Sequence, residues 1–192
     1  MNILIDEIDQ VVKSKIKEDF NTDFRVSILF ELLMQDNSLS DKVKLNQAIN
    51  LYYQNVSQIE DIEKAINNIL WFYGCGKEEV NVDENKKENT KNNKQIYSYE
   101  FDDELIYSAF RDQYGIDLQE IEYLHWWKFK TLFNGLKKDN LIVEIMGYRA
   151  IDISKIKDKD EKKYYKKLQK LYALPDMRTT QQKEADFGKA FW

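Results

Sequence analysis

The sequence contains few of the residues on which several common kinds of site depend. Cys75 is the only cysteine and His125 the only histidine among 192 residues. A single cysteine cannot form an intramolecular disulfide or supply a cysteine-based zinc site alone. The six glycines are isolated, so the chain has no glycine-rich phosphate loop and gives no support for nucleotide binding. We therefore expect neither a bound metal nor a cofactor.

The N-terminus lacks the features of a targeting segment. Residues 1–7 reach two acidic side chains after three apolar ones, which is too short for a signal peptide or a membrane-spanning helix. The formal net charge is −5, with charges of both signs interspersed, and this gives no general attraction to nucleic acid or to anionic membranes. The sequence thus predicts a protein that remains in the cytoplasm.

Apolar residues recur at helical spacing through most of the chain. Residues suited to helix caps precede these stretches, as at Asp23, Asp41 and Asp61, and Gly74 and Gly115 stand where left-handed C-terminal caps are expected. The predicted helices cover approximately residues 23–34, 41–53, 61–74, 103–115, 117–134, 141–148 and 155–172. The expected fold class is mainly α, a compact multi-helix domain over residues 1–176.

Four segments depart from this helical pattern. Alternating β-branched and charged residues around Ser14-Lys15 favour a short N-terminal β-hairpin, and Ile96–Phe101 alternates like one short strand. Residues 77–94 are almost free of apolar side chains, which predicts a flexible, disordered internal linker. Residues 177–192 form a polar tail with an aromatic end.

The densest group of large aromatic side chains is Tyr123-Leu124-His125-Trp126-Trp127. Asp117, with Glu120 three residues later, has the spacing of a capping box, so we expect one helix to begin there and run through this group. At about 100° per residue, Trp126 then faces the core, whereas Tyr123, Leu124 and Trp127 lie on a second apolar face. Either another element covers that face, or it is a protein-interaction surface made of these three residues.

No group of residues predicts catalysis, and we do not expect an enzyme. His125 shares its helical face with apolar residues, so we interpret it as a core histidine rather than a catalytic base. The last predicted helix carries lysines 162, 163, 166, 167 and 170 with two tyrosines, which resembles a nucleic-acid-binding patch. Acidic residues in the same helix offset that charge, and lysines are typical of a helix C-terminus. Nucleic-acid binding is therefore the weaker interpretation.

The segment from Ile121 to Arg149 is similar to the bacteriophage gene product fifteen family. The similarity rests on Tyr123-Leu124-His125-Trp126-Trp127 and on later apolar and aromatic positions through Tyr148-Arg149. Further matches are Asn21–Arg25, Trp71–Gly76 and Gln113–Leu118, in the same order. The resemblance covers most of residues 2–176.

This resemblance implies a protein of phage tail morphogenesis, made in the cytoplasm of the bacterial host. The expected function is that of a tail-assembly chaperone acting on the tape-measure protein or another tail protein, and a homo-oligomer is compatible with that role. One alternative is a structural tail or connector component of the virion. A second alternative is a small nucleic-acid-binding regulatory protein.

Overall fold

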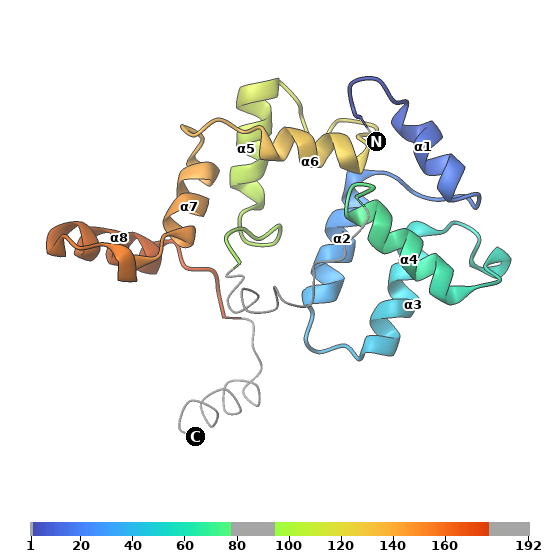
Figure 1. Cartoon of the computed structure of the whole chain (residues 1–192), viewed down its shortest axis with the longest axis horizontal. Coiled ribbons are helices and arrows are strands. Elements are labelled where there is room, and N and C mark those ends of the chain that lie inside the picture. Colours follow the sequence, from blue (N-terminus) through green and yellow to red (C-terminus); the bar gives the residue numbers. More distant parts are fainter. Residues whose placement is uncertain (1, 78–94, 177–192) are drawn as a thin grey trace.

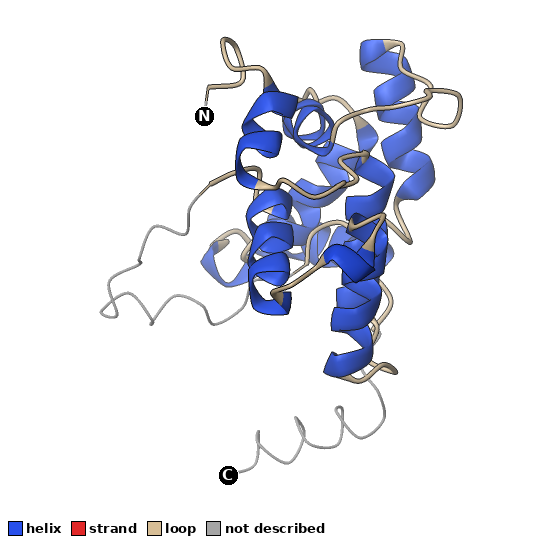
Figure 2. Ribbon diagram, turned by 90° about the vertical axis from the view of Figure 1, so that its right-hand side faces the viewer, coloured by secondary structure: helices blue, strands red, loops and turns tan. Residues whose placement is uncertain are grey.

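The computed structural model describes residues 2–77 and 95–176. Within these residues the chain forms eight α-helices and two 3-10 helices, and no strand beyond isolated bridges (Figures 1 and 2). In chain order the elements are α1 (Ile8–Lys15), α2 (Phe24–Gln35), α3 (Asp41–Tyr52), η1 (Val56–Gln58), α4 (Ile62–Tyr73), α5 (Asp103–Tyr114), α6 (Trp126–Asn134), α7 (Leu141–Ala150), η3 (Ile153–Lys155) and α8 (Lys159–Leu171). The expected mainly α fold is confirmed. The predicted linker, from residue 78 onward, and the tail at 177–192 lie outside the described residues.

Side-chain caps begin two of the predicted helices as expected. The carboxylate of Asp23 accepts a hydrogen bond from the Arg25 amide at 2.9 Å, and Asp61 accepts one from the Lys64 amide at 3.0 Å. These bonds satisfy amide groups that have no partner within the first turn of a helix. At the end of α5, Gly115 adopts the predicted left-handed conformation, with φ of 66°.

The C-terminal cap of α4 differs from the prediction. Gly74 has φ of −71°, and the left-handed residues are Cys75 and Gly76, with φ of 61° and 69°. The amide of Gly76 donates to the carbonyl of Trp71 at 2.9 Å. The turn therefore extends one to two residues further than the position of Gly74 indicated.

The predicted N-terminal β-hairpin is wrong, because residues 8–15 form α1. Ile8, Val12 and Ile16 are all buried and follow one another at intervals of four residues, which is the spacing of one helical face. Residues that looked alternating around Ser14-Lys15 thus share a face of a helix. The predicted strand at Ile96–Phe101 is also absent, and there the Asp102 amide donates to the Ser98 carbonyl at 3.0 Å to close a turn.

The central helix begins nine residues later than predicted, at Trp126 rather than at Asp117. Asp117 does accept from the amides of Gln119 and Glu120, at 3.0 and 3.3 Å, but the chain then leaves the helical path. The guanidinium of Arg25 binds the carbonyls of Leu118 and Ile121, at 3.1 and 2.6 Å, and holds these carbonyls away from a helical ladder. A cap without a following helix is the result.

The last helix also begins later than predicted, at Lys159 instead of about Lys155. Asp152 caps only the short helix η3, through the Ser154 amide at 3.0 Å, whereas Asp158 caps α8 through the Glu161 amide at 2.7 Å. The two caps divide the predicted helix into two pieces.

Helix α6 lies in the middle of the fold, where it packs against α2 and α5 (Figure 1). Its Phe129 ring is fully buried and stacks on Phe24 of α2 and Phe110 of α5, at centroid distances of 4.8 and 4.9 Å. One apolar cluster connects buried residues from α1 to α7. Helix α8 contributes no buried residue to it.

Candidate interaction surface

The aromatic segment joins two parts of the chain that are far apart in sequence. The Phe24 amide donates to the Leu124 carbonyl, and the Trp126 amide donates to the Thr22 carbonyl, each at 2.9 Å. Asp23 and His125 form an antiparallel bridge between these bonds. This pairing fixes the N-terminus of α6 beside the N-terminus of α2.

Both indole rings of the segment bind the end of α4. The Nε1 of Trp126 donates to the carbonyl of Tyr73 at 2.9 Å, and the Nε1 of Trp127 donates to the carbonyl of Phe72 at 2.7 Å. The last four carbonyls of a helix have no amide partner within it. The indole of Trp126 gives the Tyr73 carbonyl a donor, and the indole of Trp127 is a second donor to the Phe72 carbonyl, which also accepts from the Cys75 amide at 3.0 Å. Each tryptophan therefore combines a large apolar ring with a satisfied polar group.

The prediction that Trp126 and Trp127 cannot both face the same core is wrong, because both belong to one apolar cluster. Their exposed fractions are 0% and 1%. Trp127 stacks on Phe72 at 5.6 Å between centroids and meets the edge of Trp71 at 5.4 Å. A Cβ atom at Gly76 would lie only 2.9 Å from the Trp127 ring, so the turn after α4 closes directly over it. Of the two alternatives for Trp127, coverage by another element is the correct one.

The three residues predicted as an interaction surface do not form one. Leu124 is 8% exposed and Trp127 is 1% exposed, whereas Tyr123 is 46% exposed. The Tyr123 hydroxyl shares a 2.6 Å hydrogen bond with the hydroxyl of Thr22. The prediction assumed that residues 123–127 continue a helix, and the extended backbone before Trp126 changes which way each side chain points.

His125 is a core residue, as interpreted from the sequence. Its exposed fraction is 1%, and its Nδ1 accepts from the Trp127 amide at 3.0 Å, so the imidazole itself caps α6. Burial lowers the pKa of His125 to about 4, with Asp9 opposing that shift and Lys128 adding to it. The ring is therefore neutral at pH 7. Its Nε2 has no hydrogen-bond partner among the described residues.

A buried ion pair joins α5 to α7 and was not predicted. Arg149 binds Asp102 through two hydrogen bonds, at 2.6 and 2.9 Å, and both side chains are almost inaccessible to solvent. Arg149 also donates to the carbonyls of Tyr172 and Ile96, at 2.6 and 3.1 Å. One guanidinium thus ties the end of α8 and the segment before α5 to the core.

Helix α8 presents an unburied apolar face. Tyr164 and Leu171 are 56% and 66% exposed, and they lie seven residues apart on the same face of the helix. We call them, with the partly buried Leu168 between them, the arm stripe.

The other side of α8 packs on α7. Tyr148 contacts Tyr165 and Tyr172, at centroid distances of 6.5 and 6.0 Å. The side-chain amide of Gln169 donates to the carbonyls of Tyr148 and Ile151. Figure 1 shows α8 projecting from the end of α7, away from the other helices. The arm stripe is therefore the edge of α8 that α7 does not cover.

Positive charge borders the arm stripe. Lys163, Lys167 and Lys170 are exposed and follow at spacings of three and four residues, which places them in a row beside Tyr164 and Leu171. Helix α8 contains six lysines and two acidic residues in a chain of net charge −5. The surface is an apolar stripe with a basic border.

A comparison with protein families identifies the group to which the chain is related. The family model described as Bacteriophage Gp15 protein matches residues 4–174. The chain belongs to the bacteriophage Gp15 protein family. The resemblance predicted from the sequence is thereby confirmed, and the matched region includes every described helix from α1 to α8. Membership supports a phage structural or morphogenesis-related protein.

Comparisons of this Gp15 family protein with curated proteins and with solved structures find no match. Within residues 2–77 and 95–176 there is no group of three or more His, Cys, Asp or Glu side chains that could hold a metal ion. In the same residues no helix is both long and apolar enough to cross a membrane.

The described part of the Gp15 family protein also has an open groove beside α4. Its volume is about 670 Å³, and its lining is mostly polar, with Trp71 as the one aromatic residue. The ammonium of Lys15 lies 5.4 Å from the centre of the Trp71 ring. Lysines and acidic residues line the groove together, so its charge selects no single class of ligand.

Proposed function

We propose that this Gp15 family protein is a tail-assembly chaperone that binds the phage tape-measure protein and keeps it soluble. The observation that carries the proposal is the arm stripe, because Tyr164 and Leu171 leave large apolar side chains in solvent on a helix that is otherwise highly charged. Exposed apolar patches with polar borders are typical of protein interaction sites. The family membership supplies the phage context.

The arm stripe has the chemistry that recognises an amphipathic helix. Tyr164 can act as an aromatic anchor, and Leu168 and Leu171 extend the apolar contact along the same face. Lys163, Lys167 and Lys170 can pair with acidic residues beside the apolar face of the client. A client helix with apolar residues at intervals of three and four, and acidic neighbours, is the expected ligand.

Helix α8 is held in a defined position, which favours binding of a client helix. Arg149 binds the Tyr172 carbonyl, and Gln169 binds two carbonyls at the end of α7. Helix α8 is therefore already ordered before a client binds. A surface that is already ordered loses less conformational entropy on association. The proposed role needs no catalysis and no cofactor, since the client is held through apolar and ionic contacts alone.

The proposal is tested by co-expression with a fragment of the tape-measure protein. The wild-type protein should move the fragment from the insoluble to the soluble fraction. The double variant Tyr164→Ser/Leu171→Ser should lose most of this effect while keeping its own solubility and unfolding midpoint.

A matched control is Val43→Ser/Leu45→Ser on α3, which removes two apolar side chains that are 39% and 40% exposed but lie outside the arm. The control should solubilise the fragment as well as the wild type does. Equal activity of the arm variant and the wild type would refute the chaperone proposal. Stoichiometric protein in purified virions, without any effect on the fragment, would favour a structural tail component instead.

A further inference from the structure

A second apolar stripe lies on α4. Ile62 and Leu70 are 62% and 53% exposed, and Ile66 lies between them at intervals of four residues. Successive residues at this interval remain on one side of a helix. We call these three residues the α4 stripe.

The border of the α4 stripe is acidic. Glu60, Asp61 and Glu63 lie at the N-terminal end of the stripe, where Lys64 is the one lysine of α4. All four residues are exposed, so acidic side chains outnumber the basic one there. The arm stripe on α8 is bordered by lysines, so the two stripes have similar apolar character and opposite charge.

The two stripes also match in length. Tyr164 and Leu171 are seven positions apart and Ile62 and Leu70 are eight positions apart, which correspond to about 10 and 12 Å along a helix. Two short helical faces of equal length can be buried together without leaving much of either exposed. Large side chains such as tyrosine and leucine then supply most of the apolar contact.

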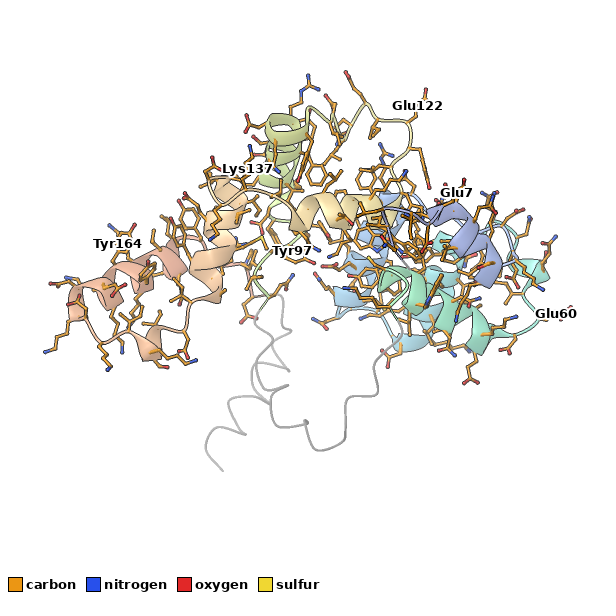
Figure 3. All side chains as sticks on the ribbon, turned by 45° about the horizontal axis from the view of Figure 1, so that its top comes forward. Glu7, Glu60, Tyr97, Glu122, Lys137 and Tyr164 are labelled. Atoms are coloured by element: carbon orange, nitrogen blue, oxygen red, sulfur yellow. The ribbon has the colours of Figure 1, made fainter. Side chains whose placement is uncertain are left out.

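One molecule cannot bring its own two stripes together. Figure 1 places α8 and α4 at opposite ends of the long axis, and Figure 3 shows Tyr164 at one end and Glu60 at the other. The helices between them form the packed core. A contact between the stripes must therefore be made by two copies of the chain.

We propose that the protein self-associates head to tail, with the arm stripe of one copy docked on the α4 stripe of the next. Such an interface joins different surfaces of the two copies, so each pair keeps one free arm stripe and one free α4 stripe. Further copies can then add until the assembly closes into a ring or continues as an open chain. The lysines beside Tyr164 meet the glutamates beside Ile62.

This inference goes beyond the chaperone role and needs no client. A client helix and a neighbouring copy would compete for the same arm stripe. The variant Ile62→Ser/Leu70→Ser keeps the arm stripe intact, so it should be monomeric and still solubilise a tape-measure fragment. The two proposals can therefore fail separately.

Sedimentation velocity of the purified full-length protein tests the self-association. The wild-type protein should show a weight-average mass that rises with protein concentration and falls when salt is added, because exposed ionic contacts are screened. The arm variant Tyr164→Ser/Leu171→Ser and the α4 variant Ile62→Ser/Leu70→Ser should each remain monomeric at all concentrations. Circular dichroism should give both variants the helical content of the wild type.

An equimolar mixture of the two variants is the decisive sample. Each variant retains the stripe that the other lacks, so the mixture should form a dimer that does not grow further. A symmetric arm-to-arm contact would not be restored by mixing. A monomeric wild type, a mixture that stays monomeric, or disruption by only one of the two variants would overturn the proposal.

Discussion

The aromatic segment at residues 123–127 and the lysine-rich helix α8 differ in burial in the opposite way to that expected from the sequence. The aromatic segment was predicted to carry an interaction surface, and α8 was not. The first has the largest apolar side chains in the chain, and both of its tryptophans are buried with satisfied indole groups. The second is dominated by lysine, and it leaves Tyr164 and Leu171 in solvent. Aromatic density therefore marks the structural centre here, and the exposed apolar stripe of α8 lies where apolar residues are few.

This difference follows from what surrounds each element. Helices on several sides enclose the start of α6, so residues 100° apart on it can both be covered. Helix α8 contacts only α7 and the short helix η3 among the principal helix pairs, and a single neighbour covers one side of a helix. Apolar residues become accessible when their helix has too few neighbouring helices, even if the helix carries only a few such residues.

The largest expected loss of stability comes from removing either tryptophan of the aromatic segment. Trp126→Ala and Trp127→Ala should each lower the free energy of unfolding by about 3–5 kcal/mol, because each empties a fully buried site. Urea denaturation followed by circular dichroism measures both values. Tyr123→Ala is the matched control and should cost less than about 1 kcal/mol, since its ring is half exposed. If Trp127→Ala behaves like Tyr123→Ala, the two tryptophans are not equivalent and the burial described here is incorrect.

The next effect concerns the buried ion pair that connects the core to helix α8. Arg149→Met should destabilise the protein by about 3–5 kcal/mol, because it leaves the Asp102 carboxylate buried without its charge partner. Adding Asp102→Asn should recover part of that loss. Lys155→Met removes the exposed pair with Asp152 and should cost about 0–1 kcal/mol, which makes it the control in the same denaturation measurement. Equal losses for the buried and the exposed pair would contradict this account.

A smaller effect depends on pH. Burial lowers the pKa of His125 from 6.5 to about 4, so the unfolded chain binds a proton that the folded chain does not in the range between these values. Stability should be unaffected by this group above about pH 7 and should decrease as the pH falls toward 4. Between pH 7 and pH 5 the expected loss is on the order of 1–2 kcal/mol.

The variant His125→Asn isolates that effect, because asparagine can still accept the capping hydrogen bond at the start of α6 but does not titrate. The difference in unfolding free energy between pH 7 and pH 5 should be smaller in the variant than in the wild type. Identical pH dependence would show that other groups determine it.

The smallest expected effect on stability is that of removing the exposed apolar side chains of α8. Tyr164→Ser/Leu171→Ser should change the free energy of unfolding by no more than about 1 kcal/mol in total, because neither side chain is buried. Thermal and urea denaturation check this directly. A loss as large as that of a core tryptophan would mean that α8 packs more tightly than its exposure indicates.

The sequence predicts helices well where a local cap and a periodic apolar face agree. That agreement holds for α2 and α4, which Asp23 and Asp61 cap and whose bounds lie close to those expected. It fails after Asp117, where the local capping bonds form but Arg25, more than ninety residues earlier, holds the following carbonyls. A tertiary contact of this kind leaves no local signal in the sequence.

The candidate surface was missed for a related reason. Helical periodicity shows that Tyr164, Leu168 and Leu171 share a face, but it does not show whether a neighbour covers that face. The projecting position of α8 comes from Arg149, which combines contacts from three separate segments. Only the arrangement of helices distinguishes a buried stripe from an accessible one.

The hydrogen bonds of the aromatic segment also set an order on folding during synthesis. Asp23 accepts a hydrogen bond from the Leu124 amide across a sequence separation of 101 residues. The carbonyls of Phe72 and Tyr73 at the end of α4 accept from indoles more than fifty residues later in the chain. Helices α1 to α4 thus leave the ribosome well before the residues that complete their packing. Contacts of such long range form late and slow the folding of a chain. The nascent N-terminal half therefore lacks these contacts until Trp127 has left the ribosome.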